Sequence, residues 1–272
     1  MEPRHRSLSP FGAEVDIDLS QPLGEAGARA LQALLRREKL LIFRDQNLSE
    51  ADQIRVVGDV GPVLPPEEEH LELSLDDEAG QVKFGYHSDI WFTAETYRQL
   101  SLYAIDIDSE TATYFVSGVR AAADLPASLC ERLRTMEAIF ISPNRLDRRD
   151  VEYDIPPSRP QHRSPAALDH PNTGELPLCV SELGAARLDD LPPTESEALL
   201  TERFERLYAG PDVYRHNWRT GDLLLWDNAA LQHGRDDQSD VRARRLRRIV
   251  GAEESVYEQA NPRVVRAPRM AD

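Results

Sequence analysis

The stretch Tyr86-His87-Ser88-Asp89-Ile90-Trp91-Phe92 contains a histidine and a carboxylate two residues apart. Side chains two positions apart on a β-strand point to the same face, so both groups can reach one metal ion. A second histidine ends the distant segment Trp226-Asp227-Asn228-Ala229-Ala230-Leu231-Gln232-His233. Two imidazoles and one carboxylate cover one face of an octahedral ion and leave the opposite face open, as in non-haem Fe(II) oxygenases. The sequence therefore predicts a metal site formed by His87, Asp89 and His233.

Two arginines follow the distal histidine within Arg244-Arg245-Leu246-Arg247-Arg248. A guanidinium is a permanently charged, two-pronged donor that matches a carboxylate, so Arg244 or Arg248 beside an iron site is suited to hold the far carboxylate of 2-oxoglutarate. Each pattern alone has a simpler explanation, because a His-x-Asp pair is most often a surface pair and an arginine cluster is often a solvated strand end. The combination of the two favours the metal site.

Four segments carry a resemblance to one enzyme family. They are Leu41-Ile42-Phe43-Arg44-Asp45-Gln46, residues 86–92, His170-Pro171-Asn172-Thr173-Gly174 and residues 221–233. Together they resemble the taurine dioxygenase (TauD/TfdA) family of Fe(II)- and 2-oxoglutarate-dependent dioxygenases. The resemblance runs over most of the chain, and the motifs are specific in combination.

The resemblance implies a role for each matching residue. Fe(II) is bound by His87, Asp89 and His233, and O2 and 2-oxoglutarate are the co-substrates. Arg244 binds the 2-oxoglutarate carboxylate, and Arg248 reaches an anionic substrate.

The chain also departs from the family pattern. Residues 110–115 keep only Thr113 and Phe115 of the segment that helps to hold 2-oxoglutarate, and Thr113 is assigned to that role. Trp91 stands where smaller residues are usual, so we expect it to narrow the substrate pocket.

Lys83 precedes His87 by four residues and is one of only two lysines in the chain. If the strand begins early enough, Lys83 shares the face of His87 and offers a charge to an anionic substrate group. The alternative is an ordinary solvated lysine on an edge strand.

Short strands and flanking helices dominate the remaining pattern. Helical spacing covers residues 24–35, and Ser49 with Asp52 and Thr194 with Glu197 have the spacing of helix-start capping pairs. Apolar or β-branched runs predict strands at residues 40–43, 100–107, 114–116, 223–226 and 246–250. These elements predict a mainly β fold with flanking helices and a double-stranded β-helix core of the jelly-roll, cupin-like kind.

The ligands lie far apart in the sequence, so one core must bring them together, and we expect residues 1–272 to form a single domain. The acidic loop at residues 64–82 leads toward His87 and is a candidate lid that excludes water, although such charge runs commonly only solvate a mobile loop. A second loop is expected at residues 147–165.

Composition limits the partners. A net charge of −16 opposes nucleic-acid binding, which needs cationic surface, so a small-molecule substrate is expected. The two cysteines, Cys130 and Cys179, are too few for a disulfide framework, and no signal peptide or membrane span is evident. These features predict a cytoplasmic protein without a membrane partner, and leave a homo-oligomer open.

The predicted function is oxidation, by default hydroxylation, of a C–H bond in a small molecule, in bacterial secondary metabolism or small-acid catabolism. A taurine or alkylsulfonate-type dioxygenase, a non-oxidative cupin-like metal enzyme and a metal-free binding protein remain as alternatives. The arginine pair favours an enzyme with an acidic co-substrate over the second alternative, and the intact triad argues against the third. A halogenase is disfavoured because Asp89 fills the position that chloride would need.

Overall fold

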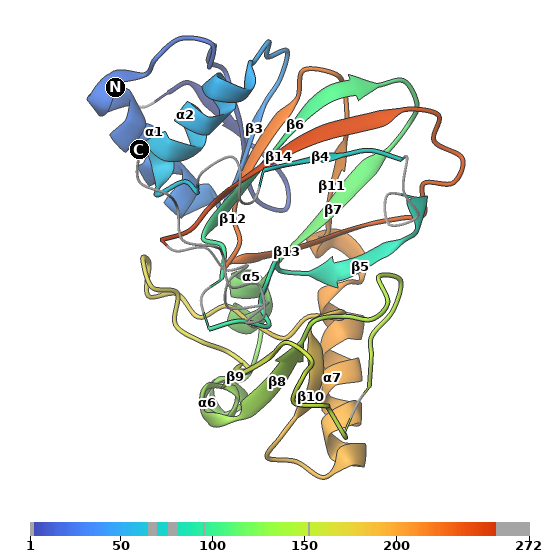
Figure 1. The fold of residues 1–272 in the computed structure, drawn as a ribbon. Coiled ribbons are helices and arrows are strands. Elements are labelled where there is room, and N and C mark those ends of the chain that lie inside the picture. Colours follow the sequence, from blue (N-terminus) through green and yellow to red (C-terminus); the bar gives the residue numbers. More distant parts are fainter. Residues whose placement is uncertain (1–2, 65–69, 76–80, 95, 152, 254–272) are drawn as a thin grey trace, which may run out of the picture.

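The computed structural model describes residues 3–64, 70–75, 81–94, 96–151 and 153–253. Its architecture is mainly β with flanking helices, as predicted (Figure 1). The larger sheet has the order β1-β2-β3-β12-β6-β14-β4. Its strands are β1 (His5–Ser7), β2 (Ala13–Val15), β3 (Leu40–Phe43), β12 (Leu223–Asp227), β6 (Gln99–Ile107), β14 (Arg244–Gly251) and β4 (Leu71–Leu73).

A smaller sheet faces the larger one and has the order β11-β7-β13-β5. Its strands are β11 (Tyr214–Asn217), β7 (Ala112–Ser117), β13 (Leu231–Arg235) and β5 (Phe84–His87). Each strand in this sheet pairs antiparallel with its neighbour. The sheet therefore brings β5 and β13, which are distant in sequence, side by side.

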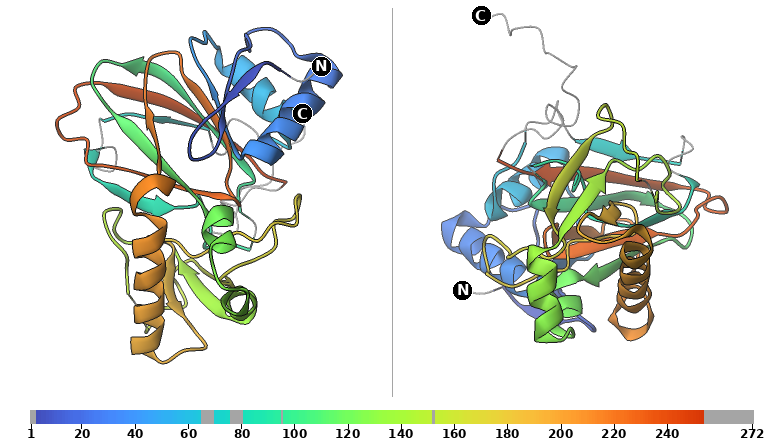
Figure 2. Two further views of the ribbon diagram at one scale, coloured as in Figure 1. Left: turned by 180° about the vertical axis from the view of Figure 1, so that it is seen from behind. Right: turned by 90° about the horizontal axis from the view of Figure 1, so that it is seen from below.

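The apolar runs of β3 and β12 are continuous because both faces of the larger sheet are buried. Leu224 and Trp226 point into the core between the two sheets, whereas Leu223 and Leu225 point outward. The outer face packs against α1 (Gly24–Glu38) and α2 (Glu50–Val60), which lie together on that side of the sheet (Figure 2).

The predicted start of α2 is confirmed. The Ser49 hydroxyl accepts a hydrogen bond from the Asp52 backbone N–H, and the Asp52 carboxylate accepts one from the Ser49 N–H. This reciprocal capping satisfies two backbone donors at the helix start.

The remaining elements form the lower part of the molecule in Figure 1. A three-stranded antiparallel sheet in the order β10-β8-β9 packs with the helices there. These elements are β8 (Glu137–Ile141), β9 (Gln161–Pro165), β10 (Ala185–Leu188), α5 (Gly118–Ala123), α6 (Ala127–Thr135), α7 (Pro193–Leu207) and a 3-10 turn η1 (Gly210–Asp212).

Three local predictions were wrong. The helix α7 begins at Pro193, and its N-cap residue is Pro192, whose side chain has no oxygen to accept a hydrogen bond, so Thr194 and Glu197 form no capping box. The segment 147–165 is not loop throughout, since β9 occupies its end and pairs with β8. Residues 64–82 likewise contain β4, an edge strand paired with β14. The acidic runs of that segment, at 67–69 and 76–78, lie outside the described residues, so the lid stays a prediction.

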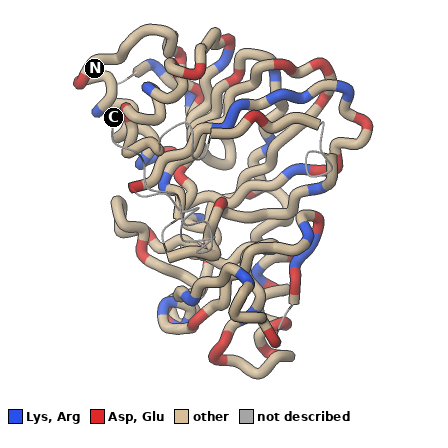
Figure 3. The backbone as a smooth tube through the Cα atoms, viewed as in Figure 1, with Lys and Arg blue, Asp and Glu red and all other residues tan. Residues whose placement is uncertain are grey.

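Acidic and basic residues are scattered over the elements, with a run of basic residues along β14 (Figure 3). None of the helices in the described part of the chain is long and apolar enough to cross a membrane.

Candidate active site

The smaller sheet and the turn after β5 bring the three predicted ligands together. His233 on β13 lies directly opposite His87 on β5 in the antiparallel register. The Nε2 atoms of His87 and His233 lie 3.1 Å and 3.6 Å from Oδ1 of Asp89. One ligand atom from each residue lies within 4.8 Å of the others, so a single metal ion can contact all three.

Asp89 reaches this position by a different route from the one predicted. The strand β5 ends at His87, and Asp89 lies in the following turn, where Ile90 has a positive φ of 59°. The side chain of Asn228 fixes this turn, because its Oδ1 accepts from the Asp89 N–H at 2.9 Å and its Nδ2 donates to the Asp89 carbonyl at 3.0 Å. Thr96 Oγ1 donates to the same carbonyl. The turn therefore places the carboxylate, and strand alternation does not.

The two imidazole rings are held by their neighbours. The Nδ1 of His87 lies 2.9 Å from the Gly85 carbonyl, a contact that suits N–H at Nδ1 and directs Nε2 toward Asp89. Phe84 stacks on His87 at 4.1 Å between ring centroids, and Trp226 packs edge-on against His233 at 5.0 Å. These contacts limit ring rotation and so define the ligand directions.

The protonation states suit a metal. Burial, the largest influence, raises the pKa of the Asp89 carboxyl, but the hydrogen bond with His87 and the charge of Arg248 outweigh it and hold the pKa below its usual range. Burial, followed by the charge of His87, lowers the pKa of His233 to about 3. An ionised carboxylate and a neutral imidazole are the forms that bind metal ions.

The triad opens into a cavity of about 170 Å³. Its lining combines an apolar wall with three guanidinium groups from β13 and β14. The apolar residues are Leu73, Phe84, Leu102, Leu146 and Trp226, and the basic residues are Arg235, Arg244 and Arg248. Such a cavity suits a ligand with an apolar body and acidic groups.

Arg244 is the buried cation of this cavity. Its side chain has no ion pair with any described residue, and its Nε is a buried donor without a partner among them. Burial, with a contribution from Arg235, lowers the pKa of Arg244 to about 9. An unpaired buried charge is unfavourable, so this position fits a negatively charged ligand such as the 2-oxoglutarate carboxylate.

Thr113 supports the same assignment. Its buried side chain lines the cavity, and its Oγ1 accepts a hydrogen bond from Trp218 Nε1 at 2.9 Å. The hydroxyl hydrogen is then free to donate to a carboxylate beside Arg244.

Arg248 lies on the same face of β14 as Arg244, as residues four apart on a strand should. Its Nη1 donates to Oδ2 of Asp89 at 2.7 Å, while its Nε is buried without a partner among the described residues. Arg248 therefore touches the carboxylate that is predicted to bind the metal, and it still has a donor available in the cavity.

Lys83 and Trp91 are not brought to the triad. Lys83 is exposed and precedes the first residue of β5, so the condition for sharing the face of His87 is not met. Trp91 packs edge-on against Phe140 and lines a different pocket. Neither residue is among the described residues that line the triad cavity.

Sequence reasoning assigned no role to two residues that help to form the site. Arg235 lies two residues after His233. Side chains two apart on a strand share a face, so this spacing would have predicted that Arg235 lines the same cavity as His233. Its Nη1 donates to the Val82 carbonyl at 2.8 Å. Asn228 lies inside the quoted Trp-Asp-Asn segment, but no local signal shows that its partner is Asp89.

Residues 4–250 match the model of the family described as taurine catabolism dioxygenase TauD, TfdA family. The chain belongs to the TauD/TfdA family. It is 30% identical to an alpha-ketoglutarate-dependent 2,4-dichlorophenoxyacetate dioxygenase of Cupriavidus pinatubonensis, over 90% of this chain and 96% of that protein. It is 27% identical to an alpha-ketoglutarate-dependent sulfate ester dioxygenase of Pseudomonas putida, over 92% and 89% of the two chains.

Solved structures show the same TauD/TfdA fold. A taurine dioxygenase from Burkholderia xenovorans superposes with a TM-score of 0.79 at 22% identity, over 93% of this chain and 92% of that one. AAD-2 in complex with Mn(II) and N-oxalylglycine superposes with a TM-score of 0.77 at 20% identity, over 94% and 99%. Membership of the TauD/TfdA family confirms the predicted enzyme class, an Fe(II)/2-oxoglutarate-dependent dioxygenase.

Replacing Asn228 with alanine should weaken metal binding. The change removes the clamp on the Asp89 turn, and loss of such supporting contacts typically costs about 10–100-fold in metal affinity. It also leaves buried backbone groups without partners, so we expect a loss of about 1–3 kcal/mol in unfolding free energy. Mn(II) titration and urea unfolding measure the two effects, with the exposed Asn217→Ala as control. Reduced stability with unchanged Mn(II) affinity would contradict the positioning role.

Proposed function

We propose that this protein binds one Fe(II) through His87, Asp89 and His233 and uses O2 and 2-oxoglutarate to oxidise a C–H bond of a small organic acid. The observation that carries the proposal is the location of the unpaired, buried Arg244 in the same cavity as the triad. A non-oxidative metal enzyme or a metal-free binding protein has no need for this pair of features. No described contact favours either alternative.

The iron, when bound with 2-oxoglutarate, supplies the oxidising chemistry: one oxygen atom goes to succinate, formed with CO2, and the other to the substrate. Hydroxylation is the default outcome. The protein supplies position and exclusion of water. Arg244 and Thr113 hold the far carboxylate of 2-oxoglutarate, while the packed rings around His87 and His233 keep the ligand directions fixed.

The lining of the cavity supports a proposal for the substrate class. Arg248 offers a guanidinium donor, and the wall around it is apolar, so we propose an acid with one anionic group on an apolar body. A relative from Sphingobium herbicidovorans is 29% identical over 82% of this chain and 85% of that protein. By their names, this relative and the one from C. pinatubonensis act on phenoxypropionate and on 2,4-dichlorophenoxyacetate. A sulfate ester or alkylsulfonate is the second candidate, supported by the P. putida relative.

We also propose that residues 1–272 form one domain and that the two facing sheets form a double-stranded β-helix. The antiparallel order of the smaller sheet and the shared core between the sheets support this description.

A substrate panel tests the proposed function. The Fe(II)-loaded enzyme with 2-oxoglutarate in air is given phenoxyacetate, short carboxylates, alkyl sulfates and taurine, and succinate and oxidised product are quantified together. One class should give both in a 1:1 ratio. Succinate formation that no compound stimulates across all classes would count against a small organic acid substrate.

Replacing Arg248 with methionine should reduce kcat/KM for the anionic substrate by roughly 30-fold or more, because a charge-assisted contact in a dry cavity is lost. The KM for 2-oxoglutarate should change far less, since Arg244 remains. The matched control is Lys83→Met, which removes an exposed charge outside the cavity and should leave both constants unchanged. Steady-state kinetics for both co-substrates provide the comparison. A large rise in the 2-oxoglutarate KM alone would reverse the assignment.

A further inference from the structure

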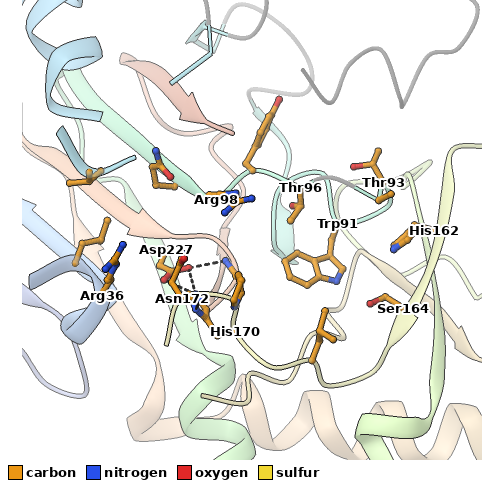
Figure 4. Close-up of a pocket in the computed structure, with 18 of the residues that line it drawn as sticks. Arg36, Trp91, Thr93, Thr96, Arg98, His162, Ser164, His170, Asn172 and Asp227 are labelled. Carbon is orange, nitrogen blue, oxygen red and sulfur yellow. Dashed lines mark hydrogen bonds and ion pairs between the residues drawn. The ribbon is translucent and has the colours of Figure 1, made fainter. Parts of the chain in front are cut away.

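A second pocket lies on the other side of the turn that carries Asp89. Its volume is about 240 Å³, compared with about 170 Å³ for the triad cavity, and the two share no described lining residue. Side chains come from the end of α1, from Trp91, Thr93, Ala94 and residues 96–99, from β9 and from the turn at 170–172. Figure 4 shows Trp91 in the middle of this lining, with His162 and Ser164 on one side and Arg98 and Arg36 on the other.

The two cavities are separated by neighbouring residues of the same segments. Trp226 lines the triad cavity, whereas Asp227 lines the second pocket, as expected for adjacent residues on a strand. In the same way, Asp89 lines the triad cavity and Trp91, two residues later in the turn, lines the second pocket. A ligand in the second pocket would therefore be distinct from the substrate and co-substrate.

The charge in this pocket is positive. Its one described carboxylate, Asp227, is already engaged by His170 Nε2 at 2.9 Å and by the Ala229 N–H at 3.1 Å. The guanidinium of Arg36 forms no ion pair with any residue that the structure describes. Glu253 approaches Arg98 only to 3.7 Å, with both side chains partly in solvent, a contact of little strength. Two arginines thus face a pocket in a chain of net charge −16.

The other groups in the lining suit the body of a flat ligand. Trp91 is half-buried and offers an aromatic surface, on which flat apolar groups stack. Ser164 adds a hydroxyl that makes no hydrogen bond with described residues. Burial lowers the pKa of His162, so its imidazole is neutral and can donate one hydrogen bond. Convergent polar groups around an aromatic surface are typical of a small-molecule site.

We propose that this pocket is a second ligand site that binds a small organic anion with a flat apolar body. Trp91 stacks on the body of the ligand, and Arg36 and Arg98 bind its anionic group. The site is independent of the proposed iron chemistry, since it contains none of the triad or its arginines.

A titration with 1-naphthoate tests this site. The full-length protein is first loaded with Mn(II) and N-oxalylglycine, so that the co-substrate position is filled, and binding is followed by calorimetry and by quenching of Trp fluorescence. We expect saturable binding at least about tenfold tighter than that of the neutral 1-naphthamide. Equal affinity for the two compounds, or no saturation, would overturn the proposal.

Variants locate the bound compound. The double variant Arg36→Met/Arg98→Met should remove the preference for the anion, and Trp91→Ala should weaken both compounds by about tenfold. The control Arg29→Met changes an exposed arginine on α1 that pairs with Glu25, and should bind as the wild type does. Binding that persists in the double variant and disappears in Arg248→Met would place 1-naphthoate in the triad cavity and overturn the second site. Because Trp91→Ala could perturb folding, Trp91→Phe serves as the conservative variant and should retain most of the affinity.

Discussion

Substrate-coupled succinate formation should fall below detection when Asp89 is replaced with alanine. The carboxylate is the only acidic member of the triad, and its Oδ1 faces both imidazoles. Loss of residues that merely support a metal ligand costs about 10–100-fold, so loss of the ligand itself should exceed a hundredfold. Succinate release and Mn(II) binding by the purified variant measure this effect.

The matched control for this change is Asp106→Ala, which removes an exposed carboxylate from β6. This control should retain wild-type activity and Mn(II) affinity. The Asp89→Ala protein also loses the partner of Arg248, so its unfolding curve must be recorded. A folded Asp89→Ala protein with full activity would exclude Asp89 as a metal ligand.

The apparent affinity for 2-oxoglutarate should fall steeply when Arg244 is replaced with methionine. Removal of one partner from a buried charge pair costs on the order of 2–5 kcal/mol, which corresponds to roughly 30-fold to several thousandfold in affinity. In the absence of ligand the change should not destabilise the fold, because the guanidinium has no ion pair with a described residue. Anaerobic titration with 2-oxoglutarate, together with urea unfolding, separates these two effects.

Arg245 offers a control one residue away. It lies on the exposed face of β14, and its contact with Glu72 is long at 3.8 Å. Arg245→Met should therefore leave 2-oxoglutarate affinity unchanged, and Arg244→Lys should recover part of it, since a lysine keeps the charge without the two-pronged geometry. A loss of affinity in Arg245→Met but not in Arg244→Met would transfer the role to Arg245.

The sequence predicted the parts of the site that depend on short-range spacing. Arg244 and Arg248 lie four residues apart, which is a whole number of strand periods, and the apolar run at 223–226 predicted the strand β12. The start of α2 could also be predicted from local sequence, because Ser49 and Asp52 cap each other and lie three residues apart. Each of these features depends on residues close together in the chain.

Features that depend on distant partners could not be predicted in this way. The turn at Asp89 is fixed by Asn228, which lies far along the chain. The prediction that Asp89 lies beside His87 and His233 is confirmed, but strand alternation is not the reason. The strand β9 contains an arginine and a proline and has no apolar alternation, and its pairing with β8 joins residues at least 20 positions apart. The prediction that Lys83 shares the face of His87 required β5 to include residue 83, but the strand begins at Phe84.

The most direct test of the central claim is anaerobic addition of Fe(II) and then 2-oxoglutarate to the metal-free protein. We predict one Fe(II) per chain and a weak visible charge-transfer band that develops with 2-oxoglutarate, is absent in Asp89→Ala, and requires much higher 2-oxoglutarate in Arg244→Met. A folded wild-type protein that binds no Fe(II), or that binds it and gives no band at saturating 2-oxoglutarate, would contradict the account.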